Sequence, residues 1–158
     1  MSDHHTSTTP PASAIRAAVS VGSQSPCMKS KRGAALWWPS FDNDDIVSAG
    51  YNRPLLGSCD GSVECRRDCG KVCLHAEQDA LLGALYDVRT AEMLHVKVVD
   101  GEPVEGGPPS CVECSKLILR SRLAAMWLLQ VGRGWVRYTV EEFHRATLKN
   151  LGLHGGAP

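Results

Sequence analysis

The sequence predicts an α/β domain, a three-layer α/β/α sandwich with a mixed sheet of about five strands. Apolar residues recur at helical spacing in several segments, and short apolar or alternating segments typical of strands lie between them. After a first pair of strands, helices alternate with strands, which is typical of a sheet covered by helices on both faces. The 158 residues suit one domain. We place it at residues 12–151, between a flexible tail at 1–11 and a second tail at 152–158.

The expected elements follow from the periodicity of apolar residues. We expect helices at residues 12–22, 74–88, 111–122 and 139–151. We expect strands at residues 33–38, 45–51, 93–99 and 124–131. The last helix starts with a capping box, because Glu142 follows Thr139 by three residues. In the strand at 93–99, Leu94 alternates with His95, which we expect on the exposed face. Residues 53–74 form a polar, cysteine-rich insertion that cannot build a core by itself.

Composition narrows the classes of protein. Seventeen basic residues balance seventeen acidic ones, which argues against binding nucleic acid or an anionic membrane through bulk charge. No apolar run approaches the roughly 20 residues that span a bilayer. The first dozen residues lack the apolar stretch of a secretory signal, so we expect a cytoplasmic protein. In a reducing compartment, seven cysteines favour metal binding or catalysis over disulfides.

Two short motifs carry metal-binding chemistry. His75-Ala76-Glu77 and Cys111-x-x-Cys114 each follow a loop and open an expected helix. Helix N-termini gather at the carboxyl edge of a parallel sheet, so these side chains can converge. One imidazole and two thiolates make a three-ligand zinc site with an open fourth position, which is the catalytic form. Zinc lowers the pKa of a bound water toward about 7, and Glu77 is placed to accept its proton.

These motifs resemble the cytidine deaminase-like superfamily and, within it, the deoxycytidylate (dCMP) deaminase branch, over about residues 15–131. The matching pieces are Gly33-Ala34, Gly50-Tyr51-Asn52, His75-Ala76-Glu77 and Cys111-x-x-Cys114. The resemblance implies hydrolysis of a cytosine nucleotide, dCMP or a close relative, to its uracil form with release of ammonia. It implies Glu77 as the catalytic acid and base, and His75, Cys111 and Cys114 as ligands of a catalytic zinc.

The resemblance also implies how the substrate is held. Asn52 would hold the sugar and the pyrimidine, and the backbone at Ala76 would contact the base. Lys29 occupies the arginine position of a Ser-x-Cys-x-Arg pattern and would contact a phosphate, as would Arg53 beside Asn52.

Three positions depart from the pattern of that branch. Ser110 stands where proline usually precedes the first cysteine, Asp79 where asparagine follows the His-Ala-Glu motif, and Arg53 where glycine follows Asn52. None of these removes a ligand or the acid and base, but together they leave the substrate open.

A second group of cysteines lies in the insertion. Cys59, Cys65, Cys69 and Cys73 have the spacing C-x5-C-x3-C-x3-C. Four thiolates make a closed tetrahedral site, and metal binding would supply the folding free energy that this polar segment lacks. The resemblance supports a second, structural zinc, since some dCMP deaminases carry one in this insertion. One or two disulfides, or three of these thiols with Cys27 or a histidine, are the alternatives.

Other functions remain open at this point. The same chemistry could serve a deaminase of single-stranded nucleic acid or transfer RNA, although the neutral net charge counts against a polymeric substrate. It could also serve a modified base or nucleoside in a specialised pathway. A non-catalytic zinc-binding module is a third alternative, against which the intact Glu77 argues. Relatives in the branch often form homo-oligomers, so we expect one here, with no membrane or nucleic-acid partner.

Overall fold

The computed structural model of the chain describes residues 8–39, 44–107 and 109–155, so the outer parts of both expected tails lie outside the described residues. The helices are α1 (Ala12–Ser23), α2 (Val63–Val72), α3 (Ala76–Gly83), α4 (Val112–Ser121) and α5 (Val140–Asn150). The strands are β1 (Lys31–Trp38), β2 (Asp45–Tyr51), β3 (Arg53–Pro54), β4 (Cys73–Leu74), β5 (Glu92–Val99), β6 (Glu102–Val104), β7 (Ala125–Gln130) and β8 (Gly134–Tyr138). None of the described helices is long and apolar enough to cross a membrane.

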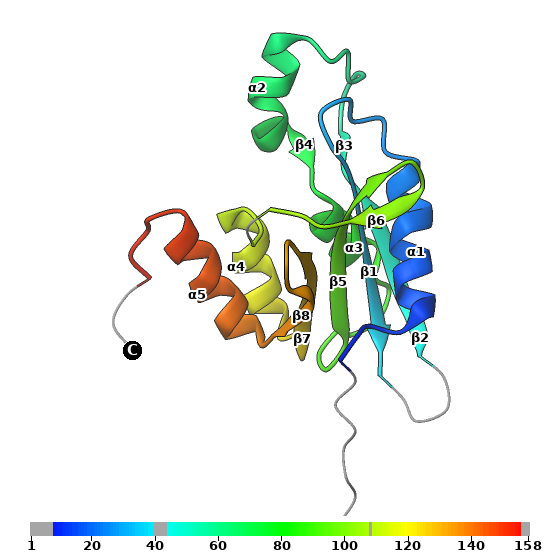
Figure 1. Ribbon diagram of the computed structural model, residues 1–158, viewed down its shortest axis with the longest axis vertical. Coiled ribbons are helices and arrows are strands. Elements are labelled where there is room, and N and C mark those ends of the chain that lie inside the picture. Colours follow the sequence, from blue (N-terminus) through cyan, green and yellow to red (C-terminus); the bar gives the residue numbers. More distant parts are fainter. Residues whose placement is uncertain (1–7, 40–43, 108, 156–158) are drawn as a thin grey trace, which may run out of the picture.

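The strands form a mixed sheet in the order β2-β1-β5-β7-β8, with the short strand β6 paired to β5 (Figure 1). Strands β5 and β7 are parallel, and the other neighbours are antiparallel. A separate pair, β3 and β4, carries the insertion with α2 away from one edge of the sheet. Both β5 and β7 therefore point their carboxyl ends to the same edge, where a site can form.

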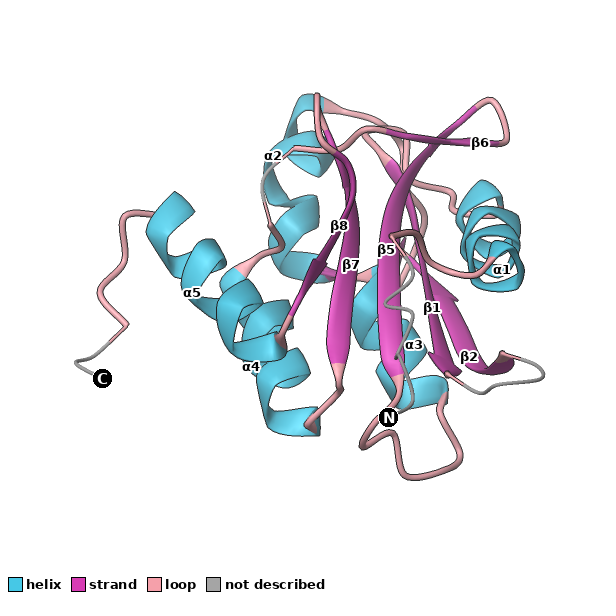
Figure 2. Cartoon of the chain, turned by 60° about the horizontal axis from the view of Figure 1, so that its bottom comes forward, coloured by secondary structure: helices cyan, strands magenta, loops and turns pink. Residues whose placement is uncertain are grey.

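Helices cover both faces of the sheet (Figure 2). Helix α1 packs on one face through Ala14 and Ala18, against the strand residues Leu94 and Val96. Helices α3, α4 and α5 pack on the other face, in a core that includes Phe143. The structure thus confirms the three-layer α/β/α prediction.

The four expected helices and four expected strands are all present, with ends that differ by a few residues. The capping box is confirmed: Thr139 N–H donates to Glu142 Oε2 at 2.9 Å, and Glu142 N–H donates to Thr139 Oγ1 at 3.2 Å. Helix α3 ends at Gly83, earlier than expected, and Leu85 beyond it is exposed. Helix α2 was not expected, because none of its residues is buried and its sequence lacks an apolar stripe.

Two glycines let helices lie directly on the sheet. A Cβ on Gly33 of β1 would lie 1.9 Å from the carbonyl oxygen of Ala18 in α1. A Cβ on Gly50 of β2 would lie 2.3 Å from the backbone nitrogen of Ala80 in α3. Both contacts are with backbone, which cannot move aside as a flexible side chain can. The spacing of the layers therefore depends on these glycines.

We expect Gly33→Ala to lower the free energy of unfolding by about 3 kcal/mol or more, because overpacking must separate α1 from the sheet. Urea denaturation followed by circular dichroism measures the change. Gly70→Ala is the matched control, since a Cβ at Gly70 in α2 meets nothing within 4 Å. It should leave stability unchanged or raised. Equal stability of the two variants contradicts the close approach.

Candidate functional site

The structure brings together three of the residues that the sequence analysis selected. His75 lies directly before α3, Cys111 caps the N-terminus of α4, and Cys114 lies in the first turn of α4. Nδ1 of His75 is 3.2 Å from the sulfur of Cys114 and 3.3 Å from the sulfur of Cys111. All three donor atoms lie within 4.8 Å of one another. Within the described ranges, this is the one such group of histidine, cysteine or acidic residues.

The donor set fits zinc. A tetrahedral zinc ion with bonds of about 2.3 Å to sulfur and about 2.0 Å to nitrogen holds its ligands roughly 3.6 Å apart. The distances at His75 are close to this spacing. The other ring nitrogen of His75, Nε2, is 3.1 Å from the carbonyl oxygen of Gly70 in α2. That bond fixes the ring and leaves Nδ1 to face the two sulfurs.

The two thiols share their protons unequally. The sulfur of Cys111 accepts the backbone N–H of Cys114 at 3.3 Å, at the positive end of α4. Hydrogen bonds from the Cys114 thiol and from His75 lower the pKa of Cys111 to about 4. The same bond to Cys111, together with burial, raises the pKa of Cys114. The surroundings of Cys111 therefore favour its thiolate form, which is the form that ligates a metal ion.

Glu77 lies in the first turn of α3, beside the metal-binding group, and its side chain is 4% exposed. Ser110 donates its hydroxyl to Oε1 of Glu77 at 2.8 Å. Nε2 of His95 is 3.9 Å from Oε2. Burial raises the pKa of Glu77, but His95, a backbone N–H and Ser110 outweigh burial and hold the pKa below its usual value. The carboxylate is therefore ionised at neutral pH.

Sequence reasoning missed the roles of two of these neighbours. In the sequence, Ser110 is notable only because proline is usual at that position. Its hydroxyl can donate a hydrogen bond to a carboxylate, which proline cannot do. The expectation that His95 lies on an exposed face was wrong: its side chain is 14% exposed. The alternation of side chains along β5 is as predicted, but the face that carries His95 borders a cavity and not open solvent.

A cavity of about 330 Å³ opens beside the metal-binding group, a size typical of small-molecule sites. Its lining includes His75, Glu77 and Cys111, together with three of the four residues expected to hold a substrate. Those three are Lys29, Asn52 and Ala76.

Asn52 is held firmly at the cavity wall. Its Oδ1 accepts the backbone N–H of Arg32 at 2.7 Å and the hydroxyl of Ser25 at 2.8 Å. Its Nδ2 donates to the carbonyl oxygen of Ser30 at 2.8 Å. These bonds fix the segment that leads into β1, and one amide hydrogen remains for a ligand. The contact of Asn52 with a sugar stays a prediction.

Arg53, the fourth expected substrate residue, does not line this cavity. Its guanidinium makes a bidentate ion pair with Asp79, at 2.5 and 2.7 Å, and stacks 4.7 Å from the ring of Tyr51. Arg53 and Asp79, two of the three residues that depart from the pattern the sequence resembles, are therefore partners. The phosphate contact of Arg53 stays a prediction.

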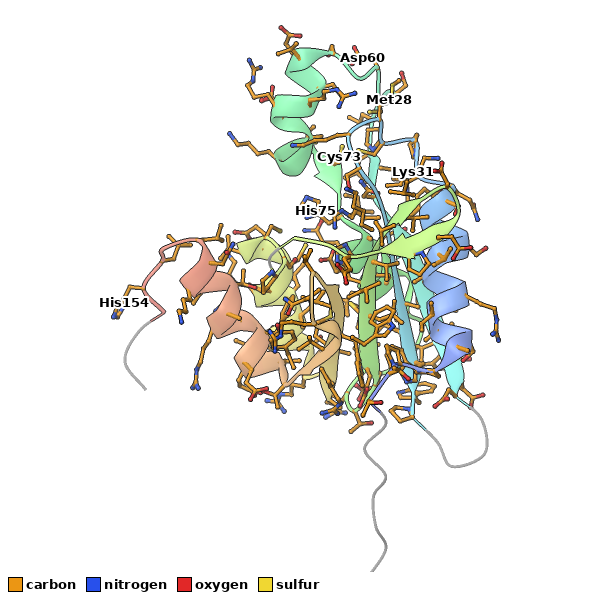
Figure 3. All side chains as sticks on the ribbon, viewed as in Figure 1. Met28, Lys31, Asp60, Cys73, His75 and His154 are labelled. Carbon is orange, nitrogen blue, oxygen red and sulfur yellow. The ribbon has the colours of Figure 1, made fainter. Side chains whose placement is uncertain are left out.

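The second group of cysteines is only partly gathered. The sulfurs of Cys59 and Cys65 are 3.4 Å apart, and Cys59 also accepts the backbone N–H of Met28 at 3.3 Å. Over the described ranges, no three thiols of the insertion lie within 4.8 Å of one another. Figure 3 shows Cys73 and His75 where the insertion joins the sheet edge.

The chain was compared with known proteins. No family model matches it, and no curated protein matches it. The crystal structure of cytidine deaminase from Burkholderia pseudomallei is similar, with a TM-score of 0.59 and 16% identity over 85% of this chain and 96% of that one. Two structures of RibD from Acinetobacter baumannii give TM-scores of 0.39 and 0.38 at 14% and 15% identity over 89% of this chain, which spans 32% of each. The first likeness shows that the chain has a cytidine deaminase-like fold.

We expect Cys114→Ser to reduce the zinc bound per chain by about one ion, because a hydroxyl is a poor substitute for a thiolate ligand. Inductively coupled plasma mass spectrometry of the purified protein measures this. The control is Glu113→Gln, an exposed residue between the two cysteines. Unchanged zinc in Cys114→Ser contradicts the assignment of this group as a zinc site.

Proposed function

We propose that this protein is a zinc-dependent hydrolytic deaminase, a hydrolase of C–N bonds, that converts a cytosine nucleotide to its uracil form with release of ammonia. One observation carries the proposal: His75, Cys111 and Cys114 converge beside the buried carboxylate of Glu77, next to a cavity large enough for a small molecule. The fold, which is like that of a cytidine deaminase, supports it.

Zinc bound by His75, Cys111 and Cys114 would supply the Lewis acidity that makes water nucleophilic near neutral pH. Glu77 moves the protons. Its Oε1 accepts the hydroxyl of Ser110, which leaves Oε2 to take a proton from the attacking water. Glu77 delivers that proton to the ring nitrogen beside the reacting carbon. It then takes the proton of the hydroxyl newly added to the reacting carbon and delivers it to the amino group, so that the C–N bond breaks, ammonia leaves and a carbonyl remains.

The substrate we propose is dCMP or a close relative. The backbone N–H of Ala76 belongs to the first turn of α3, where backbone donors lack partners within the helix, so it can donate to the base. Asn52 and Lys29 line the same cavity, where they can hold the sugar and a phosphate. Arg53 lies next to Asn52 in the chain. To bind a phosphate as well, its guanidinium would have to contact the phosphate and Asp79 at the same time.

We also propose that the protein works as a cytoplasmic homo-oligomer. Three large apolar side chains at and after the end of α3 are exposed: Leu82, Leu85 and Tyr86. Burying such side chains in an interface is favourable, which supports association. No nucleic-acid or membrane partner is proposed, since the net charge is zero.

We expect Glu77→Gln to lower kcat for cytosine deamination by about 100- to 10,000-fold, because an amide cannot carry the proton. Ammonia release from cytosine nucleosides and nucleotides measures the loss, and the zinc content should be unchanged. Glu113→Gln is the matched control and should retain full turnover, since this glutamate is exposed on α4. If Glu77→Gln binds zinc and still turns over at the wild-type rate, the proposal is wrong.

For the insertion, we propose a second, structural zinc held by Cys59, Cys65, Cys69 and Cys73, or by three of them with Cys27. The contact between the sulfurs of Cys59 and Cys65 supports it. The surroundings of Cys73 support it too: burial raises the pKa of this thiol most, and the nearby thiols of Cys27 and of the other three insertion cysteines raise it further. Thiolates around a bound cation would replace this unfavourable crowding with ligand bonds.

We expect two zinc ions per wild-type chain, and about one in Cys65→Ser. Metal analysis together with the thermal unfolding temperature tests this, because losing a structural metal destabilises the segment that it orders. Ser121→Ala, outside the insertion, is the control. A wild-type content of one zinc dismisses the second site, provided that Cys114→Ser removes that one ion.

A further inference from the structure

One wall of the cavity is basic, and Lys29 is the one residue of that wall to which a role has been given. Lys29, Ser30 and Arg32 are neighbours in the segment that enters β1, and all three line the cavity. Gly33 lies on the face of the sheet that α1 covers. Because neighbouring residues of a strand point to opposite faces, Arg32 points to the other face, where α3 and Glu77 lie. A Cβ on Gly106, in the loop after β6, would lie 3.6 Å from Nη1 of Arg32, so the guanidinium lies beside that loop.

The guanidinium of Arg32 has no partner in the part of the chain that the structure describes. Its backbone N–H is bound by Asn52, but its side chain makes no hydrogen bond there and no ion pair within 4.0 Å. The side chain is nevertheless partly buried. Burial lowers the pKa of Arg32, whereas the nearby Glu77 and Cys27 raise it. An arginine remains charged at neutral pH, and a partly buried charge without a partner is costly.

Two further donors of the same segment also have spare capacity. The hydroxyl of Ser30 is buried, with no hydrogen-bond partner in the described residues. The ammonium of Lys29 donates to the carbonyl oxygen of Arg66 at 3.0 Å, which uses one of its three N–H groups and leaves its charge unbalanced. Among the described residues that line the cavity, Glu77 carries the one carboxylate. The segment that holds Lys29, Ser30 and Arg32 therefore offers positive charge and donors that the described residues do not fully satisfy.

We propose that Arg32, with Ser30 and Lys29, forms an oxyanion-binding subsite that selects substrates carrying a negatively charged group. The inference deepens the proposed function and rests on it. A phosphate or a carboxylate of the substrate would accept the planar, bidentate hydrogen bonds that a guanidinium offers. Its charge would also offset that of the partly buried Arg32. Arg32 is thus a specificity-determining residue, distinct from Glu77, which moves protons.

The test measures binding directly. Isothermal titration calorimetry at constant ionic strength compares three probes: uridine, which is neutral, uridine 5′-monophosphate, which adds a phosphate, and orotate, which adds a carboxylate to the ring. Arg32→Gln removes the charge at similar length, Arg32→Lys retains it, and Arg16→Gln is the control on the exposed face of α1.

We expect Arg32→Gln to weaken one charged probe by about 10- to 100-fold, the usual effect of losing a hydrogen bond between charged groups. Uridine should bind unchanged, Arg32→Lys should retain part of the affinity, and Arg16→Gln all of it. Loss confined to uridine 5′-monophosphate assigns the subsite to a phosphate, and loss confined to orotate assigns it to a ring carboxylate. The inference is overturned if neither charged probe weakens, if uridine weakens equally, or if the wild type binds no charged probe better than uridine.

Ammonia release separates this inference from the proposed function. If no cytosine compound is deaminated but Arg32→Gln still loses a charged probe, the subsite stands and the deaminase proposal fails. If cytosine compounds are deaminated and Arg32→Gln weakens neither uridine 5′-monophosphate nor orotate, the deaminase stands and the subsite fails. Without ligand, we expect the free energy of unfolding of Arg32→Gln to be at least that of the wild type, because the substitution removes a charge that has no partner.

Discussion

The candidate site depends on how closely helix α3 approaches the sheet. Gly50 leaves no room for a Cβ against the backbone at Ala80, so the helix axis and its N-terminus are fixed relative to β2. His75 and Glu77 flank that N-terminus, and their positions follow from the same contact. From this position the imidazole lies 3.2 and 3.3 Å from the two sulfurs at the start of α4. Close packing of backbone thus sets the geometry of the site before any polar interaction is made.

The layers and the metal-binding group could be predicted because each has a local signal. Periodic apolar residues identify helices and strands, and His75 with Cys111 and Cys114 are chemically distinctive at helix starts. Arg32 and His95 gave no such signal. A charged residue at the edge of a strand is usually solvated, and only the arrangement of loops and helices around β1 and β5 turns these two side chains into a cavity wall. Helix α2 escaped prediction for the opposite reason, since it buries none of its residues.

The three residues that depart from the dCMP deaminase pattern, which the sequence only resembles, make contacts with residues distant in the chain. Arg53 and Asp79 lie 26 residues apart in the chain, yet they form a bidentate ion pair, and Asp79 also accepts the backbone N–H of Tyr51 at 3.0 Å. Ser110 likewise contacts Glu77 across 33 residues. Each departure supplies a donor or acceptor to a neighbour, so none leaves a buried polar group unsatisfied. Ser110 thus alters the surroundings of the Glu77 carboxylate, whereas Arg53 and Asp79 form a separate pair beside Tyr51.

The cysteine-rich insertion is coupled to the candidate site by a short path. Gly70 in α2 accepts the Nε2 hydrogen of His75, and only β4 lies between that helix and the histidine. A hydrogen bond to the outer nitrogen of a metal-binding histidine sets the orientation and basicity of the ring. An ordered insertion therefore helps to position His75. A polar helix with no buried residues cannot supply that order through a core. Thiols that draw the insertion together would therefore stabilise the histidine as well as the segment, which gives a physical reason for four cysteines directly before it.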